Sequence, residues 1–125
     1  MRYKSTRNSQ LRLEASQVIA QGISEEGGLF VPESFPDLSG ELPALAKLDY
    51  PALAKAIFSK FLTDFTEAEI EACVSRAYTP EKFGGPCPVK LVPLSGSSEE
   101  KLLLELWHGP TCAFKDMALQ ILPHF

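Results

Sequence analysis

The chain has 125 residues, and its 12 lysines and arginines against 16 aspartates and glutamates give a formal net charge of −4. This length suits one domain or part of a larger protein, and the mildly acidic composition argues against nucleic-acid binding. No apolar run is long enough to span a membrane and no signal peptide is visible, so we expect a cytoplasmic protein without a membrane partner.

The N-terminal part of the chain predicts a short strand, a helix and a second short strand. Residues 2–6 suit the first strand, and the turn in Gly27–Pro32 leads into the second. Between them, apolar residues recur at helical spacing over Leu11–Ile19. We expect Ser9 to cap this helix and Gly22 to end it.

Two further helices are predicted in the middle of the chain. Asp49 is expected to cap the first, and Thr66 with Glu69 forms the capping box of the second. We expect these helices to pack as an antiparallel pair against a small core, with Phe58 and Ile70 largely buried. The apolar stripes are Leu53, Ala54, Ile57, Phe58, Phe61 and Leu62 in the first helix, and Ile70, Cys73, Val74 and Ala77 in the second.

Glycine and proline mark two segments, 32–48 and 80–88, that we expect to be irregular. After the second, the segments Val89–Leu94 and Lys101–Trp107 are rich in alternating apolar residues. They predict a β-hairpin whose turn lies at 95–100.

Three cysteines, Cys73, Cys87 and Cys112, are an odd and sparse set, which indicates free thiols in a reducing compartment. No CxxC pair is present, and Pro110 prevents His108 and Cys112 from sharing a helical face. We therefore expect no metal site. Cys73 lies on a predicted helical core face and is interpreted as a small apolar residue.

A sharp turn follows the hairpin, and a helix is predicted from about Cys112, which places Lys115 in its first turn. The helix dipole and partial burial would both favour the neutral amine that Schiff-base chemistry requires. Thr111 is expected to cap this helix, and Asp116 places a favourable negative charge in its first turn. A lysine at a helix start is more often a solvated surface residue, and His108 more often a packing residue, so these alternatives stay open.

The segment Glu105–Asp116, Glu-Leu-Trp-His-Gly-Pro-Thr-Cys-Ala-Phe-Lys-Asp, resembles the pyridoxal-phosphate lysine segment of threonine synthases. Tyr3–Arg7 and Gly22–Pro32 resemble the opening of the same family, and the three motifs occur in the family's order. The resemblance implies an α+β protein with a threonine-synthase-like N-terminal domain of helices and short strands over residues 1–80. Residues 81–125 would then begin the core of a fold-type II pyridoxal-phosphate enzyme.

By this resemblance, the whole enzyme would be a carbon–oxygen lyase that converts O-phosphohomoserine and water to L-threonine and phosphate with pyridoxal 5′-phosphate. Lys115 would bind the cofactor as a Schiff base and move protons between substrate carbons. Phe114, Asp116 and His108 would be further cofactor-binding residues. The chain departs from the family at Asn8, where glycine is usual, although asparagine tolerates left-handed backbone better than most residues.

Threonine synthases are several times longer than this chain, and their phosphate cup lies in the additional length. The stop at Phe125, inside a hydrophobic segment, also predicts an N-terminal fragment. We expect the fragment alone to be inactive and to bind the cofactor weakly, because neither Gly27-Gly28 nor Gly84-Gly85 opens a helix. Two alternatives remain: another fold-type II lyase, and a threonine-synthase-like protein that binds the cofactor without forming threonine. The sequence leaves the oligomeric state open.

Overall fold

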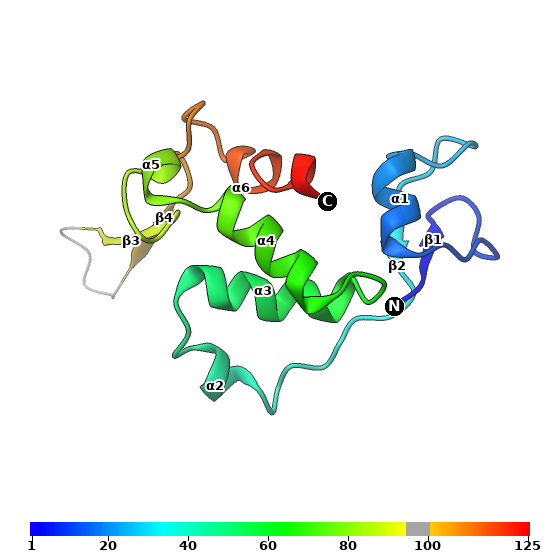
Figure 1. Ribbon diagram of the computed structural model, residues 1–125, viewed down its shortest axis with the longest axis horizontal. Helices are drawn as coiled ribbons and strands as arrows, with labels where there is room; N and C mark the ends of the chain where they lie inside the picture. Colours follow the sequence, from blue (N-terminus) through cyan, green and yellow to red (C-terminus); the bar gives the residue numbers. More distant parts are fainter. Residues whose placement is uncertain (95–100) are drawn as a thin grey trace.

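The structure, a computed structural model, describes residues 1–94 and 101–125. Within those ranges, no helix is long and apolar enough to cross a membrane. Figure 1 shows α1, β1 and β2 at one end, the α3–α4 pair beside α6 in the middle, and the β3–β4 hairpin at the other end. In chain order, the elements are β1 (Tyr3–Ser5), α1 (Ala15–Gln21), β2 (Phe30–Pro32), α2 (Leu42–Leu45), α3 (Tyr50–Phe61), α4 (Glu67–Ala77), α5 (Pro80–Phe83), β3 (Lys90–Pro93), β4 (Leu102–Glu105), α6 (Asp116–Leu119) and the 3-10 helix η1 (Leu122–His124).

The two predicted N-terminal strands are confirmed. β1 and β2 pair in antiparallel fashion, with Tyr3 opposite Pro32 and Ser5 opposite Phe30. Leu13 forms an additional bridge to Tyr3, with backbone N–H donors reaching the opposite carbonyls at 2.9 and 3.0 Å. The N-terminal motifs thus fold into a small sheet, beside which α1 begins only after Leu13.

The start of α1 differs from the prediction, while its end agrees with it. Ser9 does not cap the helix; Glu14 occupies the N-cap position and exchanges capping-box hydrogen bonds with Gln17. The helix starts late because Leu13 takes an extended conformation in its bridge to β1. Gly22 ends the helix with φ of 76°, a backbone conformation that side chains other than glycine rarely adopt.

The central helices begin where their capping residues predict. The Asp49 carboxylate accepts the Ala52 N–H at 2.9 Å at the start of α3, and Thr66 with Glu69 forms the capping box of α4. α4 reverses direction and packs across α3, as Figure 1 shows. The predicted face of α4 is buried, but Phe58 in α3 is only half-buried, because this part of α3 borders open apolar pockets.

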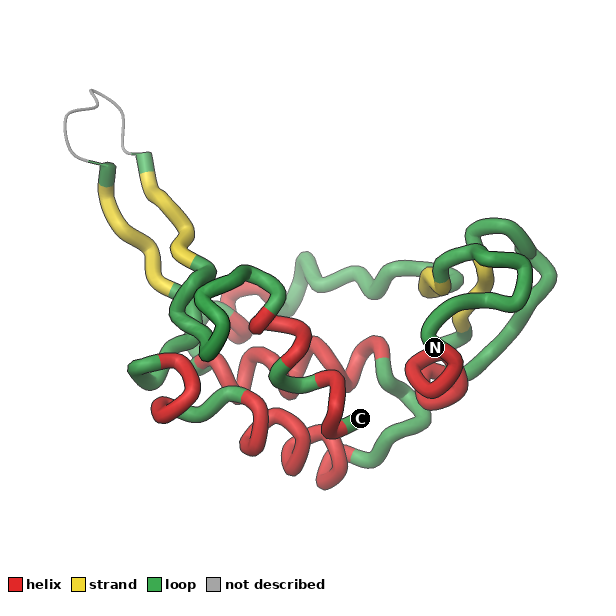
Figure 2. The backbone as a smooth tube through the Cα atoms, turned by 90° about the horizontal axis from the view of Figure 1, so that it is seen from above, coloured by secondary structure: helices red, strands yellow, loops and turns green. Residues whose placement is uncertain are grey.

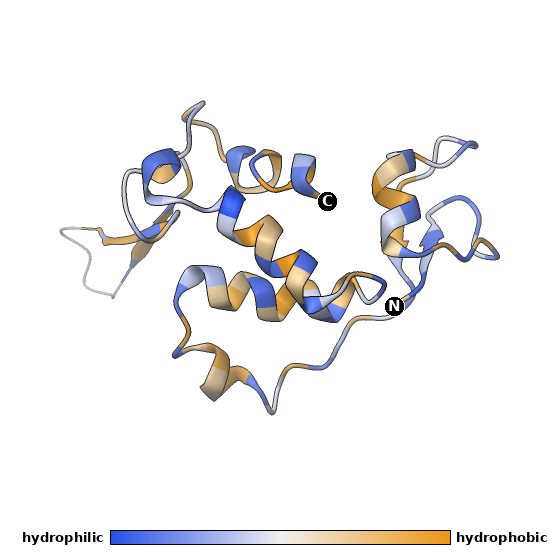
Figure 3. Ribbon diagram, in the orientation of Figure 1, coloured by the Kyte–Doolittle hydropathy of each residue, from blue (hydrophilic) through white to orange (hydrophobic). Residues whose placement is uncertain are grey.

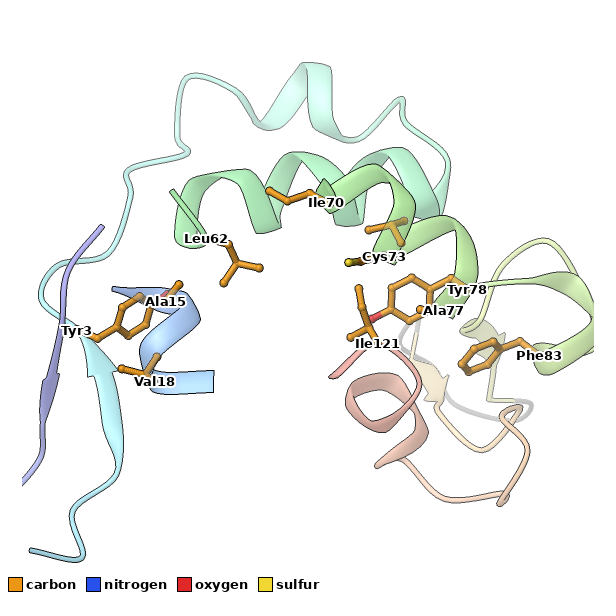
Figure 4. Packing of buried hydrophobic residues seen from close by; sticks show 11 residues of the cluster. Tyr3, Ala15, Val18, Leu62, Ile70, Cys73, Ala77, Tyr78, Phe83 and Ile121 are labelled. Atoms are coloured by element: carbon orange, nitrogen blue, oxygen red, sulfur yellow. The ribbon is translucent and has the colours of Figure 1, made fainter. Parts of the chain in front are cut away.

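A continuous set of buried apolar side chains runs from the small sheet to α5. Figure 4 shows Tyr3, Ala15, Val18 and Leu62 at one end of this core, and Phe83 at the other. The buried members are Tyr3, Ala15, Val18, Leu62, Ile70, Cys73, Val74, Ala77, Tyr78, Phe83 and Ile121.

Polar contacts also join the small sheet and α1 to the end of α3 and to the loop that follows it. The Asp64 carboxylate accepts the Ala15 N–H at 3.2 Å and the Ser16 N–H at 2.9 Å. The Tyr3 hydroxyl donates to the Phe61 carbonyl at 3.1 Å. Asp64 therefore satisfies the first amides of α1 from a distant part of the chain.

The predicted hairpin is confirmed. β3 and β4 pair in antiparallel fashion, with Lys90 opposite Glu105 and Leu91 opposite Leu104. The predicted turn at 95–100 lies outside the described residues. Figure 2 shows the hairpin projecting from the helices, and Figure 3 shows that its strands are largely hydrophobic. Its exposed large apolar residues are Leu91, Val92, Leu94, Leu102, Leu103 and Leu104.

The segments predicted to be irregular each contain one short helix. α2 lies within 32–48 and α5 within 80–88, and both have proline in the first turn. Proline suits that position because the missing N–H would have no helical partner there. The Thr79 side chain caps α5 by accepting the Lys82 N–H.

Candidate active site

The segment that carries Lys115 leaves β4, turns sharply and enters α6. The helix predicted from about Cys112 is wrong: α6 covers only Asp116–Leu119, and Lys115 is its N-cap residue. Cys112 has φ of 55°, in the left-handed region, which is incompatible with an α-helix starting there. Lys115 consequently lies between a tight turn and a single helical turn.

The Lys115 side chain is exposed, so the expected partial burial is not found. Along the described ranges of the chain, its amine has no hydrogen-bond or ion-pair partner. The residue borders an open pocket of about 620 Å³ between α3, β4 and α6. The pocket is otherwise lined by Tyr50, Val89, Leu104, Leu106, Phe114, Met117, Ala118 and Leu119.

Asp116 turns inward beside the exposed Lys115. It is fully buried, and its carboxylate accepts the Thr111 N–H at 2.8 Å and the Thr111 hydroxyl at 3.0 Å. Thr111 therefore binds Asp116 and does not cap α6, contrary to expectation. A Cβ atom on Gly109 would lie 2.7 Å from Asp116 Cγ, so glycine is required for this close approach. Asp116 closes the loop that leads into the lysine.

His108 is held at the end of β4. Its Nε2 lies 2.7 Å from Glu105 Oε2, and the Trp107 ring stacks on the imidazole with centroids 5.6 Å apart. Both members of the Glu105–His108 pair are mostly buried. Among the described residues, His108 is not part of the lining of the Lys115 pocket, whereas Phe114, 66% exposed, is.

Two tyrosines from the central helices reach this region. Tyr50 lines the Lys115 pocket, and the Tyr78 hydroxyl donates to the Met117 carbonyl at 2.8 Å. Their rings meet edge to face with centroids 5.1 Å apart, and burial raises the pKa of both hydroxyls. Neither tyrosine was predicted as a site residue, because both lie at helix ends. The sequence did offer one signal for Tyr78, which continues the four-residue spacing of Ile70 and Val74.

One of the three cysteines is buried in the core and the other two are exposed. Cys73 is buried, as predicted, and its thiol donates to the His124 carbonyl at 2.9 Å, while burial raises its pKa. Cys87 and Cys112 are exposed, and all three are free. The parts of the chain that the structure describes contain no cluster of three metal-binding side chains.

These features define a mixed helix-and-strand domain that leads into a lysine-bearing turn beside an apolar pocket. Residues 2–78 match the family model of the threonine synthase N terminus. The chain therefore belongs to the threonine synthase family, and it corresponds to the N-terminal region of its members. The sequence resemblance and the expected N-terminal domain of helices with short strands are confirmed.

Similarity to individual threonine synthases extends past the matched domain. The chain is 32% identical to the enzyme of Methylobacillus glycogenes, covering 98% of this chain and 27% of the relative. It is 37% identical to that of Corynebacterium glutamicum, covering 98% and 26%. The crystal structure of pyridoxal-phosphate-bound threonine synthase from Brucella melitensis superimposes with a TM-score of 0.87 at 32% identity, covering 99% of this chain and 26% of that one. The chain thus spans about a quarter of the length of these relatives.

Proposed function

We propose that the full-length protein is a cytoplasmic threonine synthase that converts O-phosphohomoserine and water to L-threonine and phosphate. The observation that carries this proposal is the exposed Lys115 beside an apolar pocket, in a chain whose residues 2–78 match the threonine synthase N terminus. Residues 1–80 form its N-terminal domain, and residues 81–125 begin the fold-type II catalytic domain. Its partner is a small-molecule substrate, not a nucleic acid or a membrane.

The residues around Lys115 fit pyridoxal 5′-phosphate, which supplies an electron sink when bound. The accessible amine can bind the cofactor aldehyde, and Phe114 and Leu106 offer apolar surface to a planar ring. When free of the cofactor, Lys115 Nζ would accept a proton from one substrate carbon and return it to another. A single amine thereby serves as both the attachment point and the acid–base group.

Three neighbours support this chemistry in different ways. Phe114, in the pocket wall, would contact the cofactor. Asp116 stabilises the loop, because its buried carboxylate accepts a hydrogen bond from the Thr111 N–H. The Glu105 carboxylate, in the same segment, contacts the His108 imidazole and orients it.

The cofactor phosphate requires backbone donors that the two glycine-rich segments among the described residues do not offer. The Gly27 N–H donates to the Ser24 carbonyl at 2.7 Å, and the Gly85 N–H donates to the Pro80 carbonyl at 3.2 Å. A phosphate site needs several free backbone amides, commonly at a helix N-terminus. We therefore place the phosphate cup in the additional length of the full protein.

The proposal is tested on the full-length protein by borohydride reduction, peptide mass spectrometry and assay of threonine formation. We expect a reduced pyridoxyl group on Lys115 and phosphate release from O-phosphohomoserine. Lys115→Ala should abolish both, whereas Lys90→Ala, on the exposed hairpin, should retain both. Pyridoxyl label on another lysine would contradict the assignment.

A second candidate function comes from threonine synthase-like 1 of Homo sapiens, which is 36% identical over 113 residues, covering 87% of this chain and 15% of the relative. A protein of that kind could carry the cofactor on Lys115 without forming threonine. Labelling of Lys115 together with unchanged O-phosphohomoserine would favour this alternative.

A further inference from the structure

The helix that follows Lys115 is too short to hold its own orientation. α6 has four residues, and an isolated helix of that length is unstable because few hydrogen bonds offset the cost of nucleation. In a regular α-helix, the Ile121 N–H would donate to the Met117 carbonyl. Here it donates to the Ala118 carbonyl at 3.2 Å. The Met117 carbonyl is therefore available to another donor.

Tyr78 supplies that donor from the N-terminal domain. Its hydroxyl donates to the Met117 carbonyl at 2.8 Å, two residues after Lys115. The tyrosine is only 7% exposed, and its ring packs against those of Tyr50 and Phe83, with centroids 5.1 and 6.0 Å away. A phenol enclosed in this way cannot follow a movement of α6, so it fixes the position of the carbonyl.

We propose that Tyr78 is a positioning residue for Lys115, acting through its hydrogen bond to the Met117 carbonyl. This inference rests on the proposed function, since it concerns the geometry of the cofactor lysine. Met117 and Lys115 line the same pocket, so a displacement of α6 moves the amine and the pocket wall together. The N-terminal domain would thus contribute to catalysis without touching the substrate.

Tyr3 provides a matched control for the loss of one tyrosine hydroxyl. It is 8% exposed, and its hydroxyl donates to the Phe61 carbonyl at 3.1 Å. Figure 4 places Tyr3 and Tyr78 at well-separated positions along the core. Phenylalanine at either position keeps the ring and removes one buried hydroxyl that binds a backbone carbonyl.

The test compares full-length wild type, Tyr78→Phe and Tyr3→Phe by thermal melting, cofactor release into a carbonyl trap, and steady-state kinetics. Both variants should fold with similar decreases in melting temperature. Only Tyr78→Phe should release cofactor faster and lower kcat, each by about tenfold, with KM little changed. Amide exchange in the cofactor-free protein should quicken over residues 115–121 only in this variant.

Equal cofactor release, kcat and amide exchange in the two variants would overturn the role of Tyr78, even where wild type carries pyridoxyl label on Lys115. A wild-type protein without that label would instead overturn the proposed function, and this inference with it. If Tyr78→Phe folds poorly, amide exchange in the cofactor-free wild type serves as the second measurement. The amides of residues 118–121 should then exchange as slowly as those at the C-terminal end of α4, and exchange as fast as in the exposed loop at 33–40 would overturn the inference.

Discussion

Single residues determine the path of the chain into Lys115. Gly109 is buried, and its missing side chain is what lets the backbone pass against the buried carboxylate of Asp116. A buried carboxylate needs hydrogen-bond donors, and Thr111 supplies two of them. Small changes at these positions should therefore have local but measurable effects.

Gly109→Ala is expected to destabilise the protein by about 1–3 kcal/mol, because the new Cβ would overlap Asp116. Chemical denaturation measures the change. Gly40→Ala is the matched control: a Cβ at that glycine meets no described atom within 4 Å, so stability should be little affected. Equal behaviour of the two variants would mean that the loop adapts to the added methyl group.

Whole elements are held by packing that differs between the two central helices. Ile70 in α4 is 1% exposed, whereas Phe58 in α3 is half-buried beside the C-terminal ring of Phe125, with centroids 5.3 Å apart. α4 therefore lies deeper in the core than α3. Its side chains should contribute more to stability for their size.

Ile70→Ala is expected to lower the free energy of unfolding by roughly 2–5 kcal/mol, the range for emptying a fully buried aliphatic site. Phe58→Ala should cost less than the roughly 3–5 kcal/mol of a fully buried phenylalanine, since part of its ring is already in contact with water. Urea denaturation of both variants makes the comparison. A larger loss at Phe58 than at Ile70 would contradict this order of burial.

The Asp64 cap predicts a pH dependence. Partial desolvation alone would raise the pKa of Asp64, but hydrogen bonds from Ser16 and Ala15 outweigh it and hold the pKa below its ordinary value. The cap therefore stabilises the fold above the unfolded-state pKa of about 3.9, and this contribution is lost as the pH falls through the lower folded-state pKa.

Asp64→Ala should accordingly cost about 1 kcal/mol at pH 7, the usual effect of removing a helix cap. The difference from wild type should shrink in thermal melts below about pH 4, where the carboxylate becomes protonated. Glu25→Ala, at an exposed position in the loop after α1, is the control. A difference that stays constant down to the most acidic condition would rule out a charged cap.

Features determined by neighbouring residues could be predicted from the sequence, and features determined by distant ones could not. Asp49 and Thr66 cap helices through amides three residues away, so their roles are visible locally. The late start of α1 depends on the bridge between Leu13 and β1, which involves a separate segment. The motif identified Lys115 as a candidate, but the contact of Tyr78 with α6 joins residues 39 positions apart and left no motif.

At the scale of the whole molecule, we propose that residues 1–125 supply the cofactor lysine and that the phosphate site lies in the additional length of the full protein. We expect this chain alone to bind pyridoxal 5′-phosphate weakly, because water readily hydrolyses the imine of an exposed lysine. Titration with the cofactor, followed by absorbance, should show no saturable complex. A stoichiometric complex of micromolar affinity that Lys115→Ala removes would reveal a phosphate site within these residues.

The β3–β4 hairpin should make the isolated chain prone to aggregation. Its two strands form a two-stranded sheet within the described residues, and they expose leucines on a projecting element. Unpaired strand edges with apolar side chains are templates for pairing with another copy. Concentrated solutions of this chain should therefore aggregate through the hairpin, and a charged side chain in place of Leu103 should keep the molecules apart.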